Sequence, residues 1–473
     1  MRLLIVGGGI TGLAAAWEAV HAATPDGPVD VLLVEASPRL GGKLHTEVTD
    51  GLLIEHGPDS FVSYRPGAVR LATEVGLGAD LIGTSGSRLV SLRSRGKLRP
   101  LPPGMGMVLP TRLWPFVTTG ILSPLDKLRA GIDLVLPRQL EPGKDSSIGG
   151  FLRRRLGGGI VVRFADPMVG GIYGASVDEL SLDAVLPSLR ADEEKHRSLM
   201  LASLAAGRRA RGAVKGPSSP FTTLRSGLGS LVAAVADAVT AAGAKLRLGT
   251  TVTALRPTPE GGVTANLSDG TLESADAVVL AGGVRSSAAL LEGVAPDSAR
   301  TIAGIPLATS NVLTFAYPAT AFPAPVTSHG WLEAGPAPIS GVTISSAKWA
   351  GRAPADTVVI RAFVPERVGP IAQAPDDELL AAVSRHLAAV LRIHAAPLLT
   401  RVHRWQGVMP KYVVGHLDRV AAVEAGLAGL PAWRVAGSAL RGVGIPDCVA
   451  DGRKQAALAL AAARQGTTRE VRP

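Results

Sequence analysis

A glycine-rich turn near the amino terminus is the strongest chemical signal in the chain. Gly7, Gly9 and Gly12 stand in the spacing Gly-x-Gly-x-x-Gly, after an apolar segment at residues 3–6 and before a helix-forming segment at residues 13–20. In this spacing the first glycine permits a tight turn, and the second lets a pyrophosphate approach the backbone. The third lets helix and strand pack closely. The turn therefore indicates a dinucleotide site.

An acidic residue further along the chain supports this interpretation. A second apolar segment, residues 29–34, ends in Glu35, close to the distance from the glycines at which such a site has its acidic residue. A carboxylate in this place accepts hydrogen bonds from the adenosine ribose. A glycine turn alone is weak support, but a strand before it, a helix after it and the carboxylate together favour a nucleotide. A strand–helix turn without a ligand is the alternative.

Composition limits the class of protein. A chain of 473 residues is too long for one ordinary core, so we expect two or three domains. Hydrophobic residues make up 46% and charged residues 19%, which excludes a disordered chain. The net charge of +10 includes basic concentrations at residues 93–99 and 153–155, but only 4% of residues are aromatic. We therefore expect no nucleic acid as a partner and favour an acidic small molecule or an anionic membrane surface. A merely solvated basic surface is the alternative.

Cysteine and histidine usage excludes two kinds of site. Cys448 is the only cysteine, so the chain has no intrachain disulfide, and the nine histidines show no metal-ligand spacing. We expect no metal and a cytoplasmic location. Because the first strand begins at residue 3 and no run of 18 uncharged apolar residues occurs, we expect neither a signal peptide nor a membrane span. Residues 105–122 are mostly apolar, and we expect them to be buried, with lipid contact as the alternative.

The elements that must position these residues are not a uniform strand–helix repeat. Residues 61–215 read as mostly helical, and residues 245–281 read as short strands with a hairpin at 260–262. Further strands follow up to about residue 364. A last strand, residues 433–437, leads into a glycine-containing turn and a closing helix.

We therefore predict an α/β fold built on a discontinuous Rossmann-like nucleotide-binding domain. Its pieces are residues 1–60, 220–300 and 405–473. Residues 61–219 form a mostly helical region, which contributes to the substrate site and offers a membrane contact. Residues 301–404 form an inserted α+β substrate-binding domain.

Several dispersed motifs resemble one flavoprotein family. Besides the glycine turn, they are Arg39–Lys43, Gly57–Phe61, Gly170–Gly174, Asp178–Ser181, Phe221–Gly229, Arg404–His416 and Gly437–Cys448. Together they resemble the porphyrinogen oxidases of the amine-oxidase-like superfamily, which also includes amine oxidases and phytoene desaturases. The resemblance covers nearly the whole chain and is closest to the Gram-positive type, whose substrate is coproporphyrinogen III.

The resemblance implies non-covalent FAD as the cofactor. It places the glycine turn on the pyrophosphate, the end of the second strand on the ribose, and a backbone group near residue 252 on the adenine. Two loops and the carboxy-terminal block then surround the flavin. The residues implied are Gly7, Gly8, Gly9, Ile10, Thr11, Gly12, Glu35, Ala36, Lys43, Gly57, Pro58, Asp59, Ser60, Val252, Trp405, Val443, Gly444 and Ile445.

The resemblance also implies the reaction, a six-electron oxidation of the porphyrinogen in haem biosynthesis, with dioxygen reduced to hydrogen peroxide. We expect no catalytic acid or base, because the substrate is electron-rich and aromatisation drives its oxidation, so the protein binds and orients. Four propionates call for cations, and Arg65 and Arg88 are the candidates. Tyr173 is expected to pack on the macrocycle and Gly171 to allow its close approach. A peripheral membrane contact and a haem-pathway partner enzyme are further expectations.

Four other functions are compatible with parts of this pattern. A protoporphyrinogen IX oxidase is the nearest alternative, since its substrate differs only in carrying two propionates. An amine oxidase would need an aromatic cage at the flavin, and aromatic residues are few. A phytoene desaturase would need a more lipophilic entrance. An FAD-binding protein without turnover is the non-catalytic alternative, which the intact glycine turn argues against.

Overall fold

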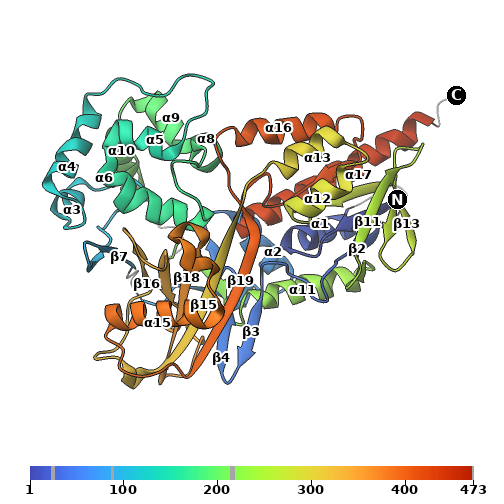
Figure 1. Cartoon of the computed structure of the whole chain (residues 1–473). Coiled ribbons are helices and arrows are strands. Elements are labelled where there is room, and N and C mark those ends of the chain that lie inside the picture. The colour runs from blue at the N-terminus through green and yellow to red at the C-terminus, as the bar shows by residue number, and fades with distance from the viewer. Residues whose placement is uncertain (23–26, 87–89, 213–218, 471–473) are drawn as a thin grey trace. The chain divides into compact units, whose positions relative to one another are not determined.

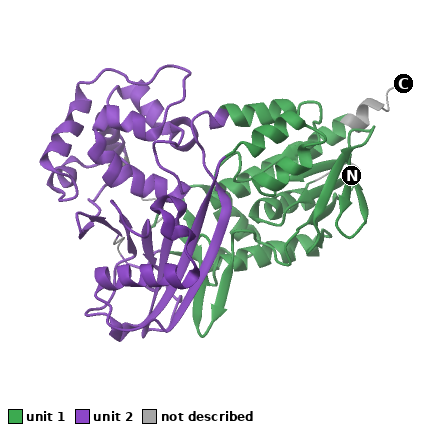
Figure 2. Cartoon of the chain, viewed as in Figure 1, with its two compact units in different colours: residues 1–83, 219–305, 418–473 green, residues 84–218, 306–417 purple. Residues whose placement is uncertain are grey.

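The computed structural model describes residues 1–22, 27–86, 90–212 and 219–470. The chain divides into two compact units (Figure 2). Unit 1 comprises residues 1–83, 219–305 and 418–473, and unit 2 comprises residues 84–218 and 306–417.

A parallel five-stranded sheet forms the centre of unit 1, with strand order β10-β2-β1-β14-β20. Leu3 to Val6 pair with both neighbouring strands in register, and all four are buried. Such strands read as continuous apolar runs because helices cover both faces of the sheet. The strands are β1 (Arg2–Val6), β2 (Asp30–Val34), β10 (Lys245–Arg247), β14 (Ala277–Leu280) and β20 (Trp433–Val435).

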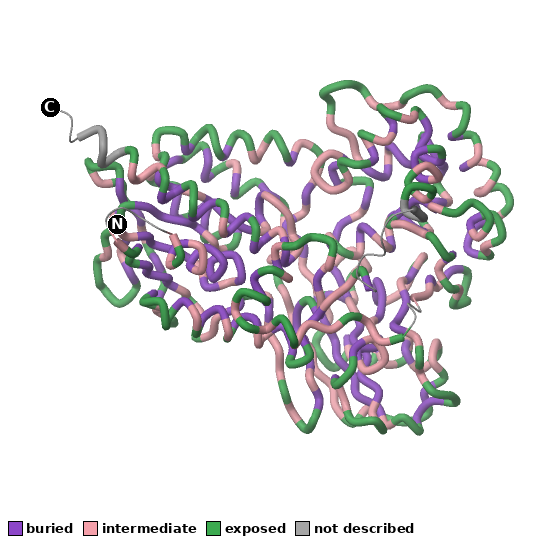
Figure 3. The backbone as a smooth tube through the Cα atoms, turned by 180° about the vertical axis from the view of Figure 1, so that it is seen from behind, coloured by how far each residue is buried: buried purple, intermediate pink, exposed green. Residues whose placement is uncertain are grey.

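Two glycines let the central helix α1 (Ile10–Val20) pack unusually close to its neighbours. A Cβ on Gly12 would lie 1.9 Å from the carbonyl oxygen of Gly7, and a Cβ on Gly452 would lie 2.2 Å from that of Thr11. Gly452 belongs to α17 (Ile445–Glu470), which lies beside α1 (Figure 1). One apolar core joins both helices to α11 (Leu228–Ala241), so this core holds the glycine turn in place. In Figure 3 the buried residues of unit 1, which carries both termini, lie inside and the exposed ones outside.

Smaller elements complete unit 1. Three small antiparallel sheets are β3–β4, β5–β9–β6 and β11–β12–β13. The elements are β3 (Thr46–Thr49), β4 (Leu52–Glu55), β5 (Phe61–Val62), α2 (Pro66–Glu74), β6 (Leu81–Gly83), β9 (Phe221–Leu224), β11 (Val252–Pro257), β12 (Val263–Leu267), β13 (Leu272–Ala275), α12 (Val284–Leu291), α13 (Pro296–Ala303) and α16 (His416–Gly426), whose first two residues fall in unit 2.

Unit 2 contains a seven-stranded sheet with order β19-β15-β18-β17-β16-β7-β8. Its pairs are antiparallel except for β16 with β7, and an apolar core joins it to α15 (Asp376–Leu391). The strands are β7 (Val90–Ser94), β8 (Lys97–Pro100), β15 (Leu307–Pro318), β16 (Gly330–Glu333), β17 (Gly341–Ile344), β18 (Thr357–Pro365) and β19 (Leu399–Pro410).

Short helices around a separate apolar core form the rest of unit 2. One of them, Val161–Gly170, is a π-helix that contains Pro167 and runs directly into α7. The α-helices are α3 (Leu113–Thr118), α4 (Pro124–Gly131), α5 (Ile148–Leu156), α6 (Gly158–Ile160), α7 (Gly171–Tyr173), α8 (Leu182–Val185), α9 (Pro187–His196), α10 (Leu199–Gly212) and α14 (Ser345–Lys348). Within the described ranges, no helix combines the length and apolar character that crossing a membrane requires.

The predicted α/β class is confirmed, but two local predictions need correction. Residues 90–100 are not helical, because β7 and β8 join a sheet whose other strands come from far along the chain. Residues 105–122 are only partly buried: Phe116 and Ile121 enter the core of unit 2, while Trp114 is 75% exposed.

Candidate cofactor site

The glycine turn has the geometry of an anion cradle. Gly7 has φ +109°, and a Cβ there would lie 2.9 Å from the Gly282 nitrogen, so only glycine fits. A Cβ on Gly9, by contrast, would meet no protein atom within 4 Å. Gly9 caps α1 without any side-chain hydrogen bond, and the first turn of α1 has no acidic residue. The open space and the uncapped N–H groups fit a pyrophosphate at this helix start.

Glu35 sits where the ribose of a nucleotide is expected. Its carboxylate accepts hydrogen bonds from the backbone nitrogens of Gly8, at 2.6 Å, and Ser37, at 2.8 Å. These bonds fix the side chain beside the turn and leave further acceptor positions for hydroxyl groups. The Glu35 carbonyl also accepts from the Thr250 nitrogen at 3.0 Å, which brings the buried Val252 and its strand to this edge. Ala36 follows and is exposed.

Arg39 is a structural residue of the site that the sequence motif contained but did not explain. Its guanidinium donates to the carbonyl oxygens of Gly42, at 2.6 Å, and of Leu40 and Leu44, at 3.2 Å each. The loop it holds is tied to the glycine turn, because the Gly41 nitrogen donates to the Gly8 carbonyl at 2.9 Å. Arg39 thus fixes the backbone from which Lys43 extends.

Lys43 and the buried Cys448 are two ionisable groups that influence each other electrostatically. The Lys43 ammonium donates to the Ser438 hydroxyl at 3.0 Å. Burial lowers the pKa of Lys43, and the nearby Cys448 opposes this shift. Burial raises the pKa of the Cys448 thiol, which the Lys43 charge opposes in turn. Each of the two groups thus influences the pKa of the other, in the wall of the predicted site.

The carboxy-terminal block forms the start of α17. Gly442 has φ +117°, and a Cβ there would lie 2.5 Å from the Asp447 Cβ. The chain then passes through residues 443–445 into the helix, and the Cys448 nitrogen donates to the Gly444 carbonyl at 2.9 Å. Asp447 also accepts two hydrogen bonds from one nitrogen of Arg65, at 2.5 and 2.6 Å. The predicted propionate ligand Arg65 is therefore engaged in an ion pair, although its side chain is 53% exposed.

The loop of residues 57–60 joins β4 to β5 in unit 1. Asp59 is buried and accepts a hydrogen bond from the Ser60 hydroxyl at 2.8 Å, while Pro58 is exposed. These contacts make the loop a fixed element, and its proposed place along the flavin remains a prediction.

Three predicted site residues belong to unit 2. Trp405 lies on β19 with its ring 4.3 Å from that of His403, and Tyr173 packs against Tyr412 at 5.7 Å. A Cβ on Gly171 would meet no atom within 4 Å, so there is free space beside it. Their roles toward flavin and substrate remain predictions. Arg88 lies outside the described residues.

Asp451 is a site residue that sequence reasoning missed. Its carboxylate accepts from the Gly437 nitrogen at 2.8 Å and from the Arg441 guanidinium, and it is 6% exposed. Gly437 has φ +105° and lies against Thr11 of the glycine turn. One signal could have found Asp451: it stands four residues after Asp447 and directly before Gly452, a glycine in an alanine-rich helix.

A model of the family "Flavin containing amine oxidoreductase" matches residues 10–460, nearly the whole chain. The chain belongs to this family. It is 53% identical to a coproporphyrinogen III oxidase of Propionibacterium freudenreichii subsp. freudenreichii, over 96% of this chain and 90% of the relative. It is 32% identical to one of Bacillus subtilis (strain 168), over 96% of each. The predicted membership of the Gram-positive type is thus confirmed, and this family member is an FAD-dependent oxidase.

Solved structures give the same result for the fold. A crystal structure from Exiguobacterium sp. 255-15, provisionally named a protoporphyrinogen oxidase, is 31% identical and matches with a TM-score of 0.83 over 97% of this chain and 99% of that one. Cyclohexylamine oxidase from Brevibacterium oxydans IH-35A, at 19% identity, matches with a TM-score of 0.67 over 98% and 99% of the two chains, and shows the fold alone. Membership of the flavin-containing family makes FAD the cofactor of this chain, and its place in the cradle of unit 1 stays a prediction.

Proposed function

We propose that this family member oxidises coproporphyrinogen III to coproporphyrin III in haem biosynthesis. The observation that carries the proposal is the 53% identity, over nearly both full lengths, to a relative named for this activity. The FAD cradle around the glycine turn supports it, because the reaction needs a two-electron acceptor.

Oxidation of one porphyrinogen requires three turnovers of the flavin. Conversion of a porphyrinogen to a porphyrin removes six electrons and six protons, and bound FAD supplies the acceptor for two electrons at a time. We propose dioxygen as the final oxidant, so three molecules of dioxygen give three of hydrogen peroxide. Aromatisation of the macrocycle provides the driving force. The chain's own residues hold the cofactor, orient the substrate and exclude water.

Different residues of this chain are proposed to bind the cofactor and the substrate. The helix start after Gly9 holds the pyrophosphate and Glu35 the ribose, as their geometry supports. Arg65 is the described candidate for a substrate propionate, because its guanidinium is a cation and its side chain is 53% exposed. Tyr173 and Gly171 are proposed to contact the macrocycle.

The test is an aerobic assay of the purified flavoprotein with coproporphyrinogen III and, separately, protoporphyrinogen IX. Porphyrin fluorescence and peroxide are followed together, and we expect one porphyrin for about three peroxides, from two electrons per flavin turnover. We expect kcat/KM to be higher for the tetracarboxylate. Protoporphyrinogen IX oxidation is the second candidate, because a chloroplastic protoporphyrinogen oxidase of Nicotiana tabacum is 26% identical. A higher kcat/KM for protoporphyrinogen IX would favour it, and no porphyrin from either would refute both.

We also propose a peripheral lipid contact through the segment from α3 to α4. Leu125, Leu128 and Trp114 are each more than 70% exposed, and Leu113 and Val117 are exposed as well. Exposed aliphatic and tryptophan side chains on short helices are typical of surfaces that lie in a membrane interface. We further propose a haem-pathway enzyme as a partner; the basic residues of the sequence motivate this.

A further inference from the structure

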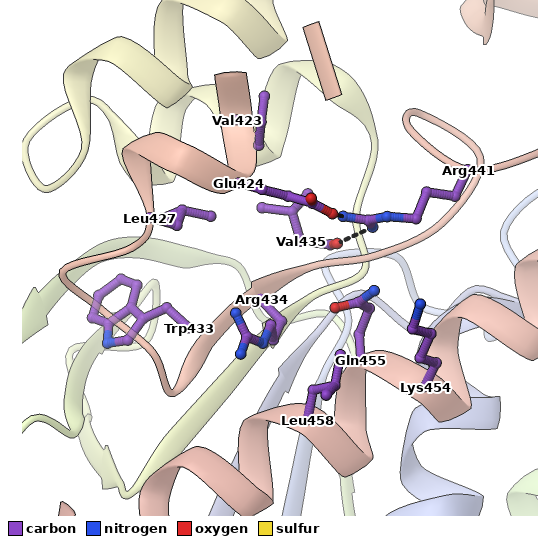
Figure 4. Close-up of a pocket in the computed structure, with 10 residues that line it drawn as sticks. All are labelled: Val423, Glu424, Leu427, Trp433, Arg434, Val435, Arg441, Lys454, Gln455 and Leu458. Carbon is purple, nitrogen blue, oxygen red and sulfur yellow. Dashed lines mark hydrogen bonds and ion pairs between the residues drawn. The ribbon is translucent and has the colours of Figure 1, made fainter. Parts of the chain in front are cut away.

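Unit 1 contains a cavity whose lining includes no residue of the glycine turn. It has a volume of about 300 Å³ and opens beside β20, the edge strand of the five-stranded sheet (Figure 4). Its walls come from α16, from β20 and from the middle of α17. None of the predicted cofactor or substrate residues in the described part of the chain lines it.

Cations dominate the polar side of this cavity. Arg434, Arg441 and Lys454 line it, against one carboxylate, Glu424. Glu424 is already paired with Arg441 at 2.5 Å, and Arg441 also reaches the buried Asp451. Arg434 and Lys454 have no hydrogen-bond or ion-pair partner among the described residues, and the Arg434 Nε is buried without one. A buried donor without an acceptor is costly, and an anion would satisfy it.

The opposite side of the cavity is apolar. Trp433 and Leu427 lie at one end and Lys454 at the other, with Arg434 between them (Figure 4). The indole nitrogen of Trp433 donates to the Gly262 carbonyl at 3.3 Å, and the side chain is only 1% exposed, so the ring forms a packed end wall of the cavity. Leu458 adds further apolar surface. Such a site suits a molecule with one anionic end and an apolar body.

We propose that this cavity binds a small organic anion, whose carboxylate pairs with Arg434 and Lys454 while its apolar body lies on Leu458, the exposed apolar side chain of the wall. Burial lowers the pKa of Arg434, Glu424 raises it and Arg441 lowers it further. A bound carboxylate would compensate for the burial of this guanidinium. The volume of the cavity, about 300 Å³, also suits a single-ring or short-chain acid rather than a macrocycle.

The cavity wall is connected to the cofactor cradle through Asp451. This carboxylate accepts from the amide of the cavity residue Gln455 at 3.1 Å and from the Gly437 nitrogen at 2.8 Å. Gly437 in turn lies against Thr11 of the glycine turn. We therefore expect an anion in the cavity to strengthen FAD binding, and FAD to strengthen anion binding by the same factor, because coupling between two binding equilibria is reciprocal.

The test uses the FAD-loaded full chain and three probes in calorimetric titrations: benzoate, its neutral isostere benzamide, and inorganic phosphate. We expect benzoate to bind and the other two to bind at least about tenfold more weakly. Arg434→Gln should weaken benzoate about tenfold and Lys454→Gln about threefold. Lys454 is exposed, so its replacement does not threaten folding. Lys245→Gln, at the opposite edge of the same sheet, is the matched control and should change nothing.

Two results would overturn the site. The first is that benzamide or phosphate binds as tightly as benzoate. The second is that the Arg434→Gln variant keeps both the flavin content and the benzoate affinity of the unaltered protein. The coupling has its own readout, the rate at which FAD is lost on dilution, followed by the recovery of flavin fluorescence. We expect benzoate to slow FAD loss from the unaltered protein. We expect it to leave the rate of FAD loss from the Arg434→Gln variant unchanged. Benzoate binding that changed neither this rate nor the dissociation constant of FAD would overturn the coupling. Neither readout depends on which porphyrinogen is oxidised.

Discussion

At the scale of single residues, Gly9 and Gly12 of the same turn are glycines for different structural reasons. Space beside Gly9 is open, whereas a Cβ on Gly12 would lie 1.9 Å from the Gly7 carbonyl. The first glycine keeps room for a ligand, and the second keeps α1 against β1. Substitutions at the two positions should therefore fail in different ways, although both remove a glycine from the same motif.

Gly9→Val should give a folded protein that retains less than about a tenth of its FAD, because the new methyl groups occupy the space of the pyrophosphate. Gly12→Val should lose about 3 kcal/mol or more of stability, because backbone must move. Flavin absorbance and thermal unfolding separate the two outcomes. Gly293→Val, at another open glycine of unit 1, is the control and should keep its FAD. Full flavin content in Gly9→Val would contradict the cradle.

Arg65 poses a question of role rather than of folding. It is exposed yet paired with Asp447, so either the pair is structural or Asp447 only orients a substrate ligand. If Arg65 binds a propionate, Arg65→Gln should raise KM about tenfold for coproporphyrinogen III and less for protoporphyrinogen IX. Asp447→Asn leaves the cation in place together with one hydrogen-bond acceptor to orient it, and should raise KM much less. A similar rise in KM for both variants would make the ion pair structural.

At the scale of elements, prediction from sequence worked where a pattern is local. The strand Arg2–Val6 and the helix after it follow from an apolar run and glycine spacing. β7 was missed because its identity as a strand depends on pairing with β16, about 240 residues later. The residues of the candidate cofactor site also fall into those that a local motif predicts and those that only tertiary packing brings together. Glu35 belongs to a short motif, whereas Asp451 reaches Gly437 only after α17 has packed on α1.

The helix α4 carries a prediction about membranes. Leu125 and Leu128 are 77% and 71% exposed and stand three residues apart, on one face of the helix. Leu128→Glu should lower binding to phosphatidylglycerol vesicles about tenfold, because a charge replaces apolar surface in the interface. Leu398→Glu, an equally exposed leucine of unit 2 before β19, is the control and should bind as the unaltered protein does. Equal sedimentation with vesicles for both variants would remove α4 from the proposed contact.

At the scale of the whole molecule, the chain crosses between the two units four times. Unit 1 is assembled from three segments, and its last segment supplies both β20 and α17. Val278 to Leu280 of β14 pair with β20, and Gly452 of α17 packs on Thr11. The glycine turn is thus complete in sequence by residue 12 but complete in space only when residues 418–473 have folded onto it.

A chain ending at residue 417 should therefore fail to bind FAD, even though it keeps Gly7 to Gly12 and Glu35 unchanged. Its central sheet would lose an edge strand, and α1 would expose the face that α17 covers, so we expect little soluble protein and no flavin. Removing only residues 471–473 is the matched control and should leave flavin content and unfolding temperature as they are. The measurements are soluble yield and flavin absorbance after purification with added FAD. A truncated chain that bound FAD stoichiometrically would show that the turn needs no support from α17, against the packing of Gly452 on Thr11.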